Sequence, residues 1–226
     1  VLANVRGTGN SAGSFGFLSR DEQQDHYEII EWIAVQDWSN GQVAGIGAGY
    51  YGTSQWHMAI QNPPHLACVA PFNGVLAPYQ DWARSGGVAT ADFLNWYEGR
   101  IRDSHAFPNI GAARFIELDL RLELLRHPLL DEYWFPRSAM NYLDQIRIPV
   151  FMLGNWSSNA HHTNQSFRSF GLLPSSARML TGNSVAGLQD MDLLENELLP
   201  FYQWCFSEQN PNNAHAQKAR IRLAVR

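Results

Sequence analysis

The first part of the chain alternates short apolar runs with longer amphipathic segments. Between residues 20 and 38, apolar side chains recur at helical spacing and acidic residues crowd the first turn, as the helix dipole favours. Short apolar runs bounded by Gly, Pro and Asn indicate buried strands instead. Alternation of this kind is typical of parallel βαβ units. We therefore expect strands at 1–5, 42–48 and 65–74, a helix at 20–38, and a second helix that ends near Gln61.

The pattern changes at residue 77. The segment 77–145 is rich in Trp, Tyr, Arg and Asp and shows no convincing strand alternation, whereas its stretch 113–127 has a clear helical pattern. An inserted, mostly helical subdomain is predicted there. Beyond it we expect strands at 146–156 and 177–181, helices near 162–170 and at 191–206, a linker at 210–217, and a strand that begins in the last ten residues.

These elements predict an α/β fold in four parts, with both ends of the chain cut from something longer. The four parts are a first core segment at 1–76, a helical cap at 77–145, a second core segment at 146–209, and a linker with the start of a C-terminal β domain at 210–226.

Composition and charge narrow the class of function. The chain has 226 residues, 45% of them hydrophobic, and a net charge of −5, so a sizeable core is expected. No basic stripe indicates nucleic acid as a partner, and no apolar run approaches the ~20 residues of a membrane helix. The two cysteines, Cys68 and Cys205, lack the spacing of a metal site or a disulfide framework, so we interpret them as two core thiols. No cofactor is expected.

The stretch QVAGIGAGYYGTSQW (42–56) has the order of a strand, a sharp turn and a helix. A nucleophile elbow has this order, needs small residues around a tight backbone, and uses the N–H after the nucleophile to bind an oxyanion. Here Gly49 stands at the apex and Tyr50 would supply the N–H. Glycine has no attacking atom, and Ser54 lies more than one helical turn further on. The alternative interpretation is a Gly-rich turn that merely packs closely.

Six segments that follow one another along the chain resemble one family. They are NVRGTGNSAGSF, with Asn4 where an aspartate is usual, the helix and tryptophan segment after it, the turn at Gly49, PPHLACVAPFNG, HPLLDEYWFPRS (127–138) and IRIPVFMLGNW (146–156). The chain thereby resembles the CocE/NonD, or X-Pro dipeptidyl-peptidase-like, acyl hydrolases. The resemblance implies an α/β-hydrolase parallel-sheet core with an inserted helical cap. It also implies that the N-terminal strands and a C-terminal jelly roll are missing from this chain.

Carried across residue by residue, the resemblance places the catalytic triad on residues that lack its chemistry. The nucleophile position falls on Gly49, the acid position close to Ser158, and the base position on or near Gly182. The chain offers no aspartate between Asp144 and Asp190.

Two histidines follow the expected acid turn. His161 and His162 could line a pocket and act as acid or base, but a cap or surface contact at the start of a helix is the favoured interpretation. A metal site at the pair lacks a third ligand nearby in the sequence. No histidine occurs between His162 and His215.

Aromatic residues are the other pocket candidates. Asp131 and Trp134 in the 127–138 signature are expected to anchor the cap. Trp156 and Tyr133, together with Tyr50, could line an aromatic pocket or belong to the plain core.

Three hypotheses follow for function. The favoured one is a pseudo-hydrolase that keeps the fold, lacks the triad and binds a small-molecule ligand, an acyl substrate or a partner protein. The second is an enzyme of altered chemistry, such as a lyase, isomerase or cyclase, that uses His162 or Tyr50 in the same pocket. The third is an ordinary acyl esterase or peptidase. A missing edge strand would also favour self-association or a partner chain that completes the sheet.

Overall fold

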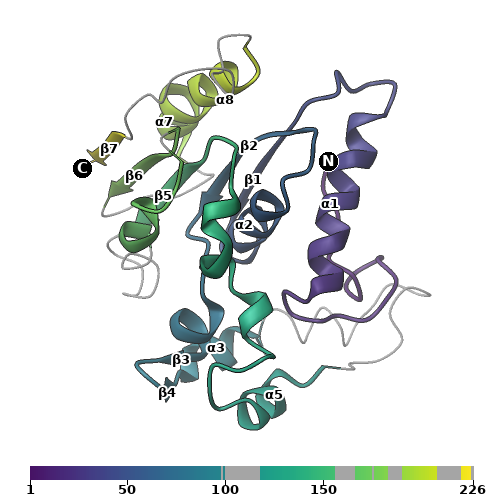
Figure 1. Cartoon of the computed structure of the whole chain (residues 1–226), viewed down its shortest axis with the longest axis vertical. Helices are drawn as coiled ribbons and strands as arrows, with labels where there is room; N and C mark the ends of the chain where they lie inside the picture. Colours follow the sequence, from purple (N-terminus) through teal and green to yellow (C-terminus); the bar gives the residue numbers. More distant parts are fainter. Residues whose placement is uncertain are drawn as a thin grey trace. The chain divides into compact units, whose positions relative to one another are not determined.

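A computed structural model describes residues 1–97, 99, 118–155, 166–174, 176–182, 190–207 and 220–224 (Figure 1). The chain divides into two compact units, each described separately below. Unit 1 comprises Val1–Asp25 and Ala77–Ser138, and unit 2 comprises His26–Leu76 and Ala139–Arg226.

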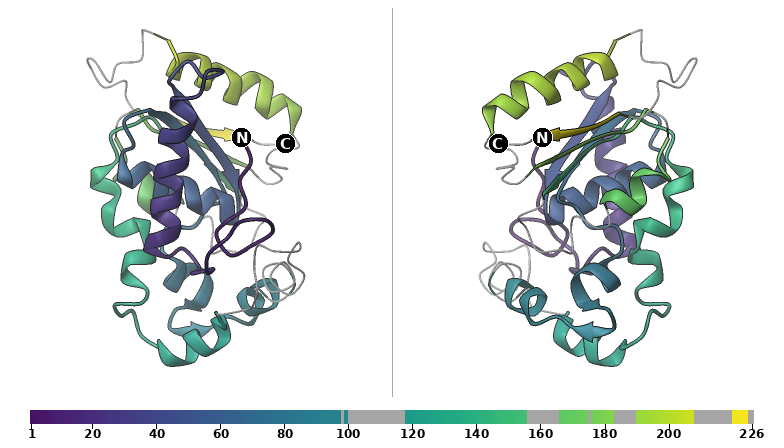
Figure 2. Two further views of the ribbon diagram at one scale, coloured as in Figure 1. Left: turned by 90° about the vertical axis from the view of Figure 1, so that its right-hand side faces the viewer. Right: turned by 90° about the vertical axis from the view of Figure 1, so that its left-hand side faces the viewer.

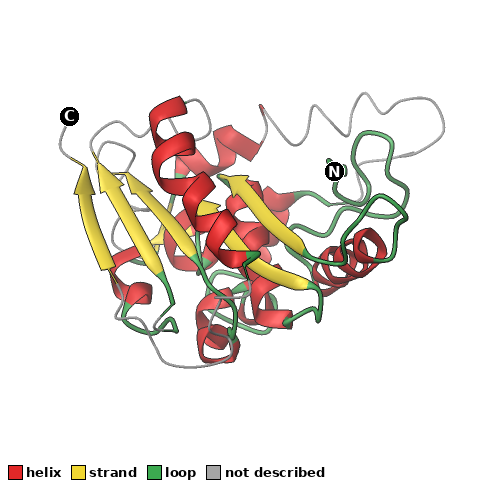
Figure 3. Cartoon of the chain, turned by 90° about the horizontal axis from the view of Figure 1, so that it is seen from above, coloured by secondary structure: helices red, strands yellow, loops and turns green. Residues whose placement is uncertain are grey.

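Unit 2 is built on a five-stranded, wholly parallel sheet with the order β1-β2-β5-β6-β7 (Figure 3). Parallel neighbours require crossover connections, which agrees with the βαβ units that the sequence predicts, so the α/β class is confirmed. The strands are β1 (Val43–Ala48), β2 (Leu66–Phe72), β5 (Phe151–Asn155), β6 (Arg178–Gly182) and β7 (Arg220–Ala224).

The helices of unit 2 follow the sequence pattern closely. Helix α1 (Arg20–Ala34) begins in unit 1 and ends four residues earlier than expected, in the turn before β1, and α2 (Tyr50–Gln61) ends at Gln61 as expected. Residues 166–170 are helical, and η4 (Ala139–Gln145) is a 3-10 helix. The last helical run comprises α7 (Met191–Leu193), the π-helical η6 (Leu194–Leu198) and α8 (Leu199–Cys205). Pro200 has no N–H for the helical bond to residue 196, which accounts for the wide turn just ahead of it.

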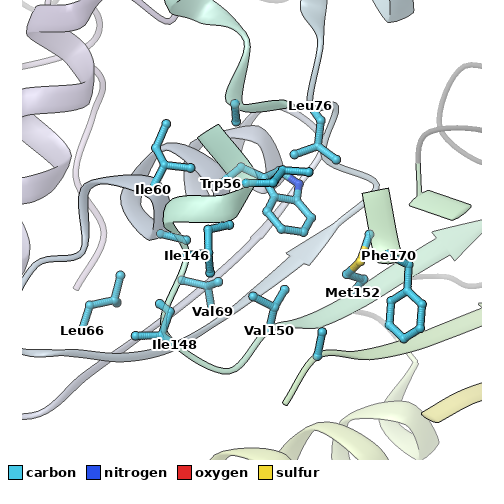
Figure 4. Close-up of a cluster of buried hydrophobic side chains, with 14 of the residues drawn as sticks. Trp56, Ile60, Leu66, Val69, Leu76, Ile146, Ile148, Val150, Met152 and Phe170 are labelled. Atoms are coloured by element: carbon cyan, nitrogen blue, oxygen red, sulfur yellow. The ribbon is translucent and has the colours of Figure 1, made fainter. Parts of the chain in front are cut away.

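Helices lie on both faces of the sheet of unit 2 (Figure 2), and an apolar cluster of side chains fills the space on each face. On one face, Trp56 and Ile60 of α2 pack with Val69 and Met152 of the sheet (Figure 4). On the other, Phe201 and its neighbours in the C-terminal helices cover alternate residues of β2 and β5. Burial on both faces explains why these strands are nearly continuous apolar runs in the sequence.

The longer regular elements in the described part of unit 1 are helical, as expected for the middle of the chain, and they are joined by loops and turns. Unit 1 also holds a hairpin of two-residue strands, which the sequence pattern does not predict. Its elements are the π-helical η1 (Tyr79–Ala83), β3 (Arg84–Ser85), β4 (Val88–Ala89), α3 (Ala91–Trp96), α5 (Leu120–Arg126) and the 3-10 helix η3 (Phe135–Arg137).

Residues 1–5 form a loop, so the predicted strand there is wrong. The Val5 carbonyl accepts bonds from the N–H and the hydroxyl of Thr8, and the Asn4 carbonyl accepts one from the Ser11 hydroxyl. Because these carbonyls close local turns, they are not available to a strand ladder. The side chains of Val1 and Leu2 are fully or largely exposed.

Two further elements differ from the prediction. Helix α5 begins at Leu120, since the Asp119 carboxylate caps it by accepting the N–H groups of Arg121 and Leu122. Residues 113–117 of the predicted helix lie outside the described residues. At the C-terminal end, where the sequence places the start of a separate β domain, β7 pairs in parallel with β6.

Within the described residues, no helix is long and apolar enough to cross a membrane.

Candidate functional site

The turn between β1 and α2 has the backbone geometry of an elbow. Gly49 has φ 60° and ψ −119°, a conformation that an L side chain adopts only with strain. Its N–H donates to the Phe72 carbonyl of β2 at 2.9 Å, and its carbonyl accepts the Thr53 N–H at 2.9 Å. The apex is therefore fixed on both sides by backbone bonds.

Small residues around the apex are required by close backbone contact. A Cβ on Gly52 would lie 2.5 Å from the Phe72 carbonyl oxygen and 3.0 Å from the Gly74 backbone, and a Cβ on Gly47 would overlap the backbone of Tyr51. At Gly49, by contrast, a Cβ would meet no atom of the described residues within 4 Å. Among these residues, the turn is tight at its base and open at its apex.

The apex also adjoins the N-terminus of a helix. Tyr50 is the first residue of α2, and Gly49 provides no side-chain cap to the N–H groups there. Such groups favour an anion or an oxyanion. The Tyr50 side chain is buried and packs edge-on against the exposed Tyr51 ring, with 6.3 Å between the ring centroids. Tyr50 thus directly follows the apex as the first residue of the helix, and its role in an oxyanion hole stays a prediction.

Neighbouring hydroxyl groups are engaged in the structure of the turn. The Ser54 hydroxyl, on a side chain that is 3% exposed, donates to the Tyr51 carbonyl at 2.8 Å. The Thr53 hydroxyl donates to the Gly49 carbonyl and accepts the Val75 N–H. Both groups therefore stabilise the helix start and are poorly placed to act as nucleophiles.

The strands of unit 2 bring two of the predicted triad positions, Gly49 and Gly182, to one edge of the sheet. Gly49 follows the last residue of β1, and Gly182 is the last residue of β6. They are separated by three strand spacings, or roughly 14 Å. The register aligns Ala48, Phe72, Leu153 and Leu180 side by side. Ser158, Trp156, His161 and His162 lie outside the described residues.

Comparison with known proteins identifies the family. Residues 1–185 match the sequence profile of the X-Pro dipeptidyl-peptidase (S15) family. The chain belongs to this family. Its parallel sheet and helices match those of a CocE/NonD family hydrolase from Staphylococcus aureus, with a TM-score of 0.77, 28% identity and 97% of this chain covered. The α/β-hydrolase fold that the resemblance implies is thereby confirmed.

Two curated relatives of this chain are named as esterases. A protein of Mycobacterium bovis that carries the name of a serine esterase is 36% identical over 105 residues, which is 46% of this chain. The cocaine esterase of a Rhodococcus species is 24% identical over 204 residues, which is 75% of this chain. The matched region spans 17% and 35% of these relatives, and 38% of the staphylococcal chain.

In unit 1, the S15-like signature at 127–138 folds as a packed cluster. Trp134 is buried, and its indole N–H donates to the His127 carbonyl at 3.0 Å. The Tyr133 ring stacks on the His127 ring with 4.4 Å between centroids, and the Arg137 guanidinium lies 3.8 Å from the Tyr133 centroid. Asp131 accepts bonds from the His127 ring and the Tyr133 N–H. Trp134 and Asp131 therefore serve as internal anchors of this unit.

Tyr133 has a buried hydroxyl group. Within the part of the chain that the structure describes, this hydroxyl has no hydrogen-bond partner. Burial, opposed by the nearby Arg137 charge, raises the pKa of Tyr133 to about 12. The phenol therefore stays protonated near neutral pH and cannot serve as a base there.

Arg137 has a role that the sequence pattern does not reveal. Its guanidinium donates to the carbonyls of Phe17 at 3.0 Å and Gly16 at 3.2 Å. Phe17 and Leu18 are buried and have φ values of 48° and 58°, so the loop is strained. The Glu22 carboxylate accepts the Leu18 N–H at 2.7 Å. The signature thus holds the glycine-rich loop of the family, although Phe17 and Arg137 are 120 positions apart in the sequence. The sequence hints at this contact only through the resemblance, in which both motifs belong to the same family.

No group of three or more metal-ligand side chains that could hold an ion occurs within the described ranges.

Proposed function

We propose that this chain is a pseudo-hydrolase of the S15 family, which binds an acyl ester or amide without forming a covalent intermediate. The observation that carries the proposal is Gly49, which occupies the apex of the elbow and has no atom of the described residues within 4 Å of the position of a Cβ. Serine-type hydrolysis requires an attacking atom at this position, and glycine has none. The hydroxyls of Ser54 and Thr53 are engaged with backbone groups.

The residues at the expected acid and base positions support the same proposal. The acid position falls near Ser158, and the base position near Gly182, the last residue of β6. Neither residue can perform the corresponding proton transfer. If one triad residue were replaced, a single substitution could restore the mechanism. With all three replaced, neither the covalent step nor the proton transfers of the triad can take place.

The elbow retains features that favour a polar ligand. The start of α2, where Gly49 provides no side-chain cap, is the positive end of the helix dipole and favours a carbonyl oxygen or a carboxylate. The apex has room for an acyl group as far as the described residues are concerned, because none of their atoms lies within 4 Å of the position that a Cβ would take. Relatives of this chain are named as esterases, so acyl esters and X-Pro amides are the first ligands to test.

The test is covalent labelling by a fluorophosphonate, measured by intact mass on the wild type, on Gly49→Ser and on Gly41→Ser. Gly41 is a matched control, since it also has a positive φ, 84°, and a Cβ there would meet no atom within 4 Å. We expect no adduct on the wild type or on Gly41→Ser, and slow labelling of Gly49→Ser. Stoichiometric labelling of the wild type would refute the loss of serine chemistry.

Binding is tested separately by calorimetry with p-nitrophenyl acyl esters and X-Pro amides. Saturable binding without release of p-nitrophenol is expected. If the folded protein binds neither class of compound, the ligand-binding half of the proposal fails. If the wild type releases p-nitrophenol and Gly49→Ser does not raise this rate, the protein is an enzyme with a different mechanism.

A further inference from the structure

The two cysteines meet across the interior of unit 2. Cys68 lies in the middle of β2, and Cys205 is the last residue of α8. Both thiols are reduced, both side chains are buried, and both belong to the apolar layer under the C-terminal helices. Strand β2 and helix α8 contact each other, and both cysteines belong to one cluster of packed side chains between them. The fold therefore pairs two residues that the sequence separates by 137 positions.

The surroundings of the pair are apolar and well anchored. The Tyr202 hydroxyl, one helical turn before Cys205, donates to the Gly45 carbonyl of β1 at 3.0 Å. The Arg178 guanidinium lies 5.1 Å from the Trp204 ring centroid. Burial, followed by the hydrogen bond and the charge of Cys205, raises the pKa of the Cys68 thiol well above its usual range. While α8 is intact, the Cys68 thiol is therefore protonated and slow to react.

We propose that Cys68 and Cys205 form a latent disulfide site that a two-electron thiol oxidant closes, tying β2 to α8. With an azo compound such as diamide as the oxidant, one thiol adds across the N=N bond. The second thiol then attacks the sulfur of that adduct and displaces the reduced hydrazine. Two S–H bonds are lost and one S–S bond forms, while two electrons and two protons pass to the oxidant.

Opening of the last turn of α8 gives access to the pair. Helix ends open locally with less free energy than a whole domain, and Cys205 is the terminal helical residue. Once closed, the disulfide would restrict a long loop of the unfolded chain, which stabilises the folded state. The oxidised protein should therefore have a higher urea midpoint than the reduced protein.

The experiment is oxidation of the native protein by diamide, followed by intact mass and non-reducing tryptic mapping. We expect the monomer to lose the mass of two hydrogen atoms. We also expect a reducible link between peptide 21–84, which holds Cys68, and peptide 179–218, which holds Cys205. Cys68→Ser and Cys205→Ser should each abolish this mass loss. Unchanged thiols, stable diamide adducts, or dimers linked between chains would each overturn the proposal.

A second variant tests the access route without touching the thiols. Tyr202→Phe removes the bond from α8 to Gly45, so diamide should close the disulfide several-fold faster than in the wild type. Tyr79→Phe is the matched control, since it removes a similar bond, to the Pro128 carbonyl at 2.9 Å, in unit 1. Equal rates in Tyr202→Phe and Tyr79→Phe would contradict opening at α8.

Discussion

The close approach of α2 to β2 makes Gly52 a sharp test of how the elbow is built. A Cβ at Gly52 would lie 2.5 Å from the Phe72 carbonyl oxygen and 3.0 Å from the backbone of Gly74. These are backbone atoms of a central strand and its turn, and they cannot rotate away. Overpacking typically destabilises a protein by about 1–3 kcal/mol, and the value here should fall near the upper end. Replacing a helical glycine by alanine stabilises the helix by about 1 kcal/mol, which offsets part of this destabilisation.

We therefore expect Gly52→Ala to reduce the free energy of unfolding by about 2 kcal/mol, or roughly 4–8 °C in Tm for a chain of this size. Urea unfolding followed by circular dichroism measures the change. Gly171→Ala is the control, because a Cβ there meets nothing within 4 Å, and it should lie within about 0.5 kcal/mol of the wild type. If Gly52→Ala proves as stable as this control, the tight contact between α2 and β2 does not exist.

Two further predictions concern the sheet edge and the signature. Strand β1 is an edge strand of the described sheet, and its Ile46 is 40% exposed; we therefore propose self-association through β1. Light scattering should show a mass that rises with concentration and that Ile46→Lys lowers, whereas a monomeric mass throughout would exclude it. Burial raises the pKa of Asp131, but hydrogen bonds from His127 and the Tyr133 N–H outweigh it and hold that pKa below its usual value. The charged Asp131 carboxylate stabilises the folded state at pH values above its pKa in the unfolded chain, and this stabilisation is lost as pH falls through its lower pKa in the folded state. The difference in Tm between the wild type and Asp131→Asn should therefore shrink below about pH 4. A difference independent of pH would contradict this.

Local pattern predicted the elements of the elbow region well. The strand before Gly49, the helix after it and the strand after Pro64 each carry their own apolar periodicity and are separated by turn residues. Helix α2 ends in a left-handed Asn62 whose side chain donates to the Gln145 carbonyl. In such segments local propensity and tertiary packing agree, so the sequence alone is sufficient.

Prediction failed where the outcome depends on a distant partner. The run at 1–5 is apolar enough for a strand, yet a strand also needs a neighbour, and the carbonyls of Asn4 and Val5 bond locally. The pairing of β7 with β6 likewise depends on which edge is open. The contact of Cys68 with Cys205 requires the C-terminal helices to cross back over β2. The apolar periodicity of these segments does not specify which distant segment each of them contacts.

The candidate site was predictable in identity and less so in geometry. Glycine at position 49 is visible in the sequence, and its lack of a side chain is enough to exclude a nucleophile at that position. The open space above Gly49 and the engagement of the Ser54 hydroxyl are visible only in three dimensions. The predictions for Trp156, Ser158 and the adjacent histidines stay predictions.

The elbow keeps its shape without the residue that such a turn usually presents. Its conformation follows from contacts below the apex, since the Gly49 N–H is bound to Phe72 and the approach of Gly52 to Gly74 leaves no room for side chains. A serine at φ 60° would be strained by about 1–3 kcal/mol, and glycine avoids this strain. Replacement of the nucleophile by glycine would therefore stabilise the fold while it removed the attacking atom, a trade between stability and activity that is common at strained sites. Under the proposed function, the turn persists because the packing of α2 on β2 requires it, and its open apex and helix N-terminus remain available to a ligand.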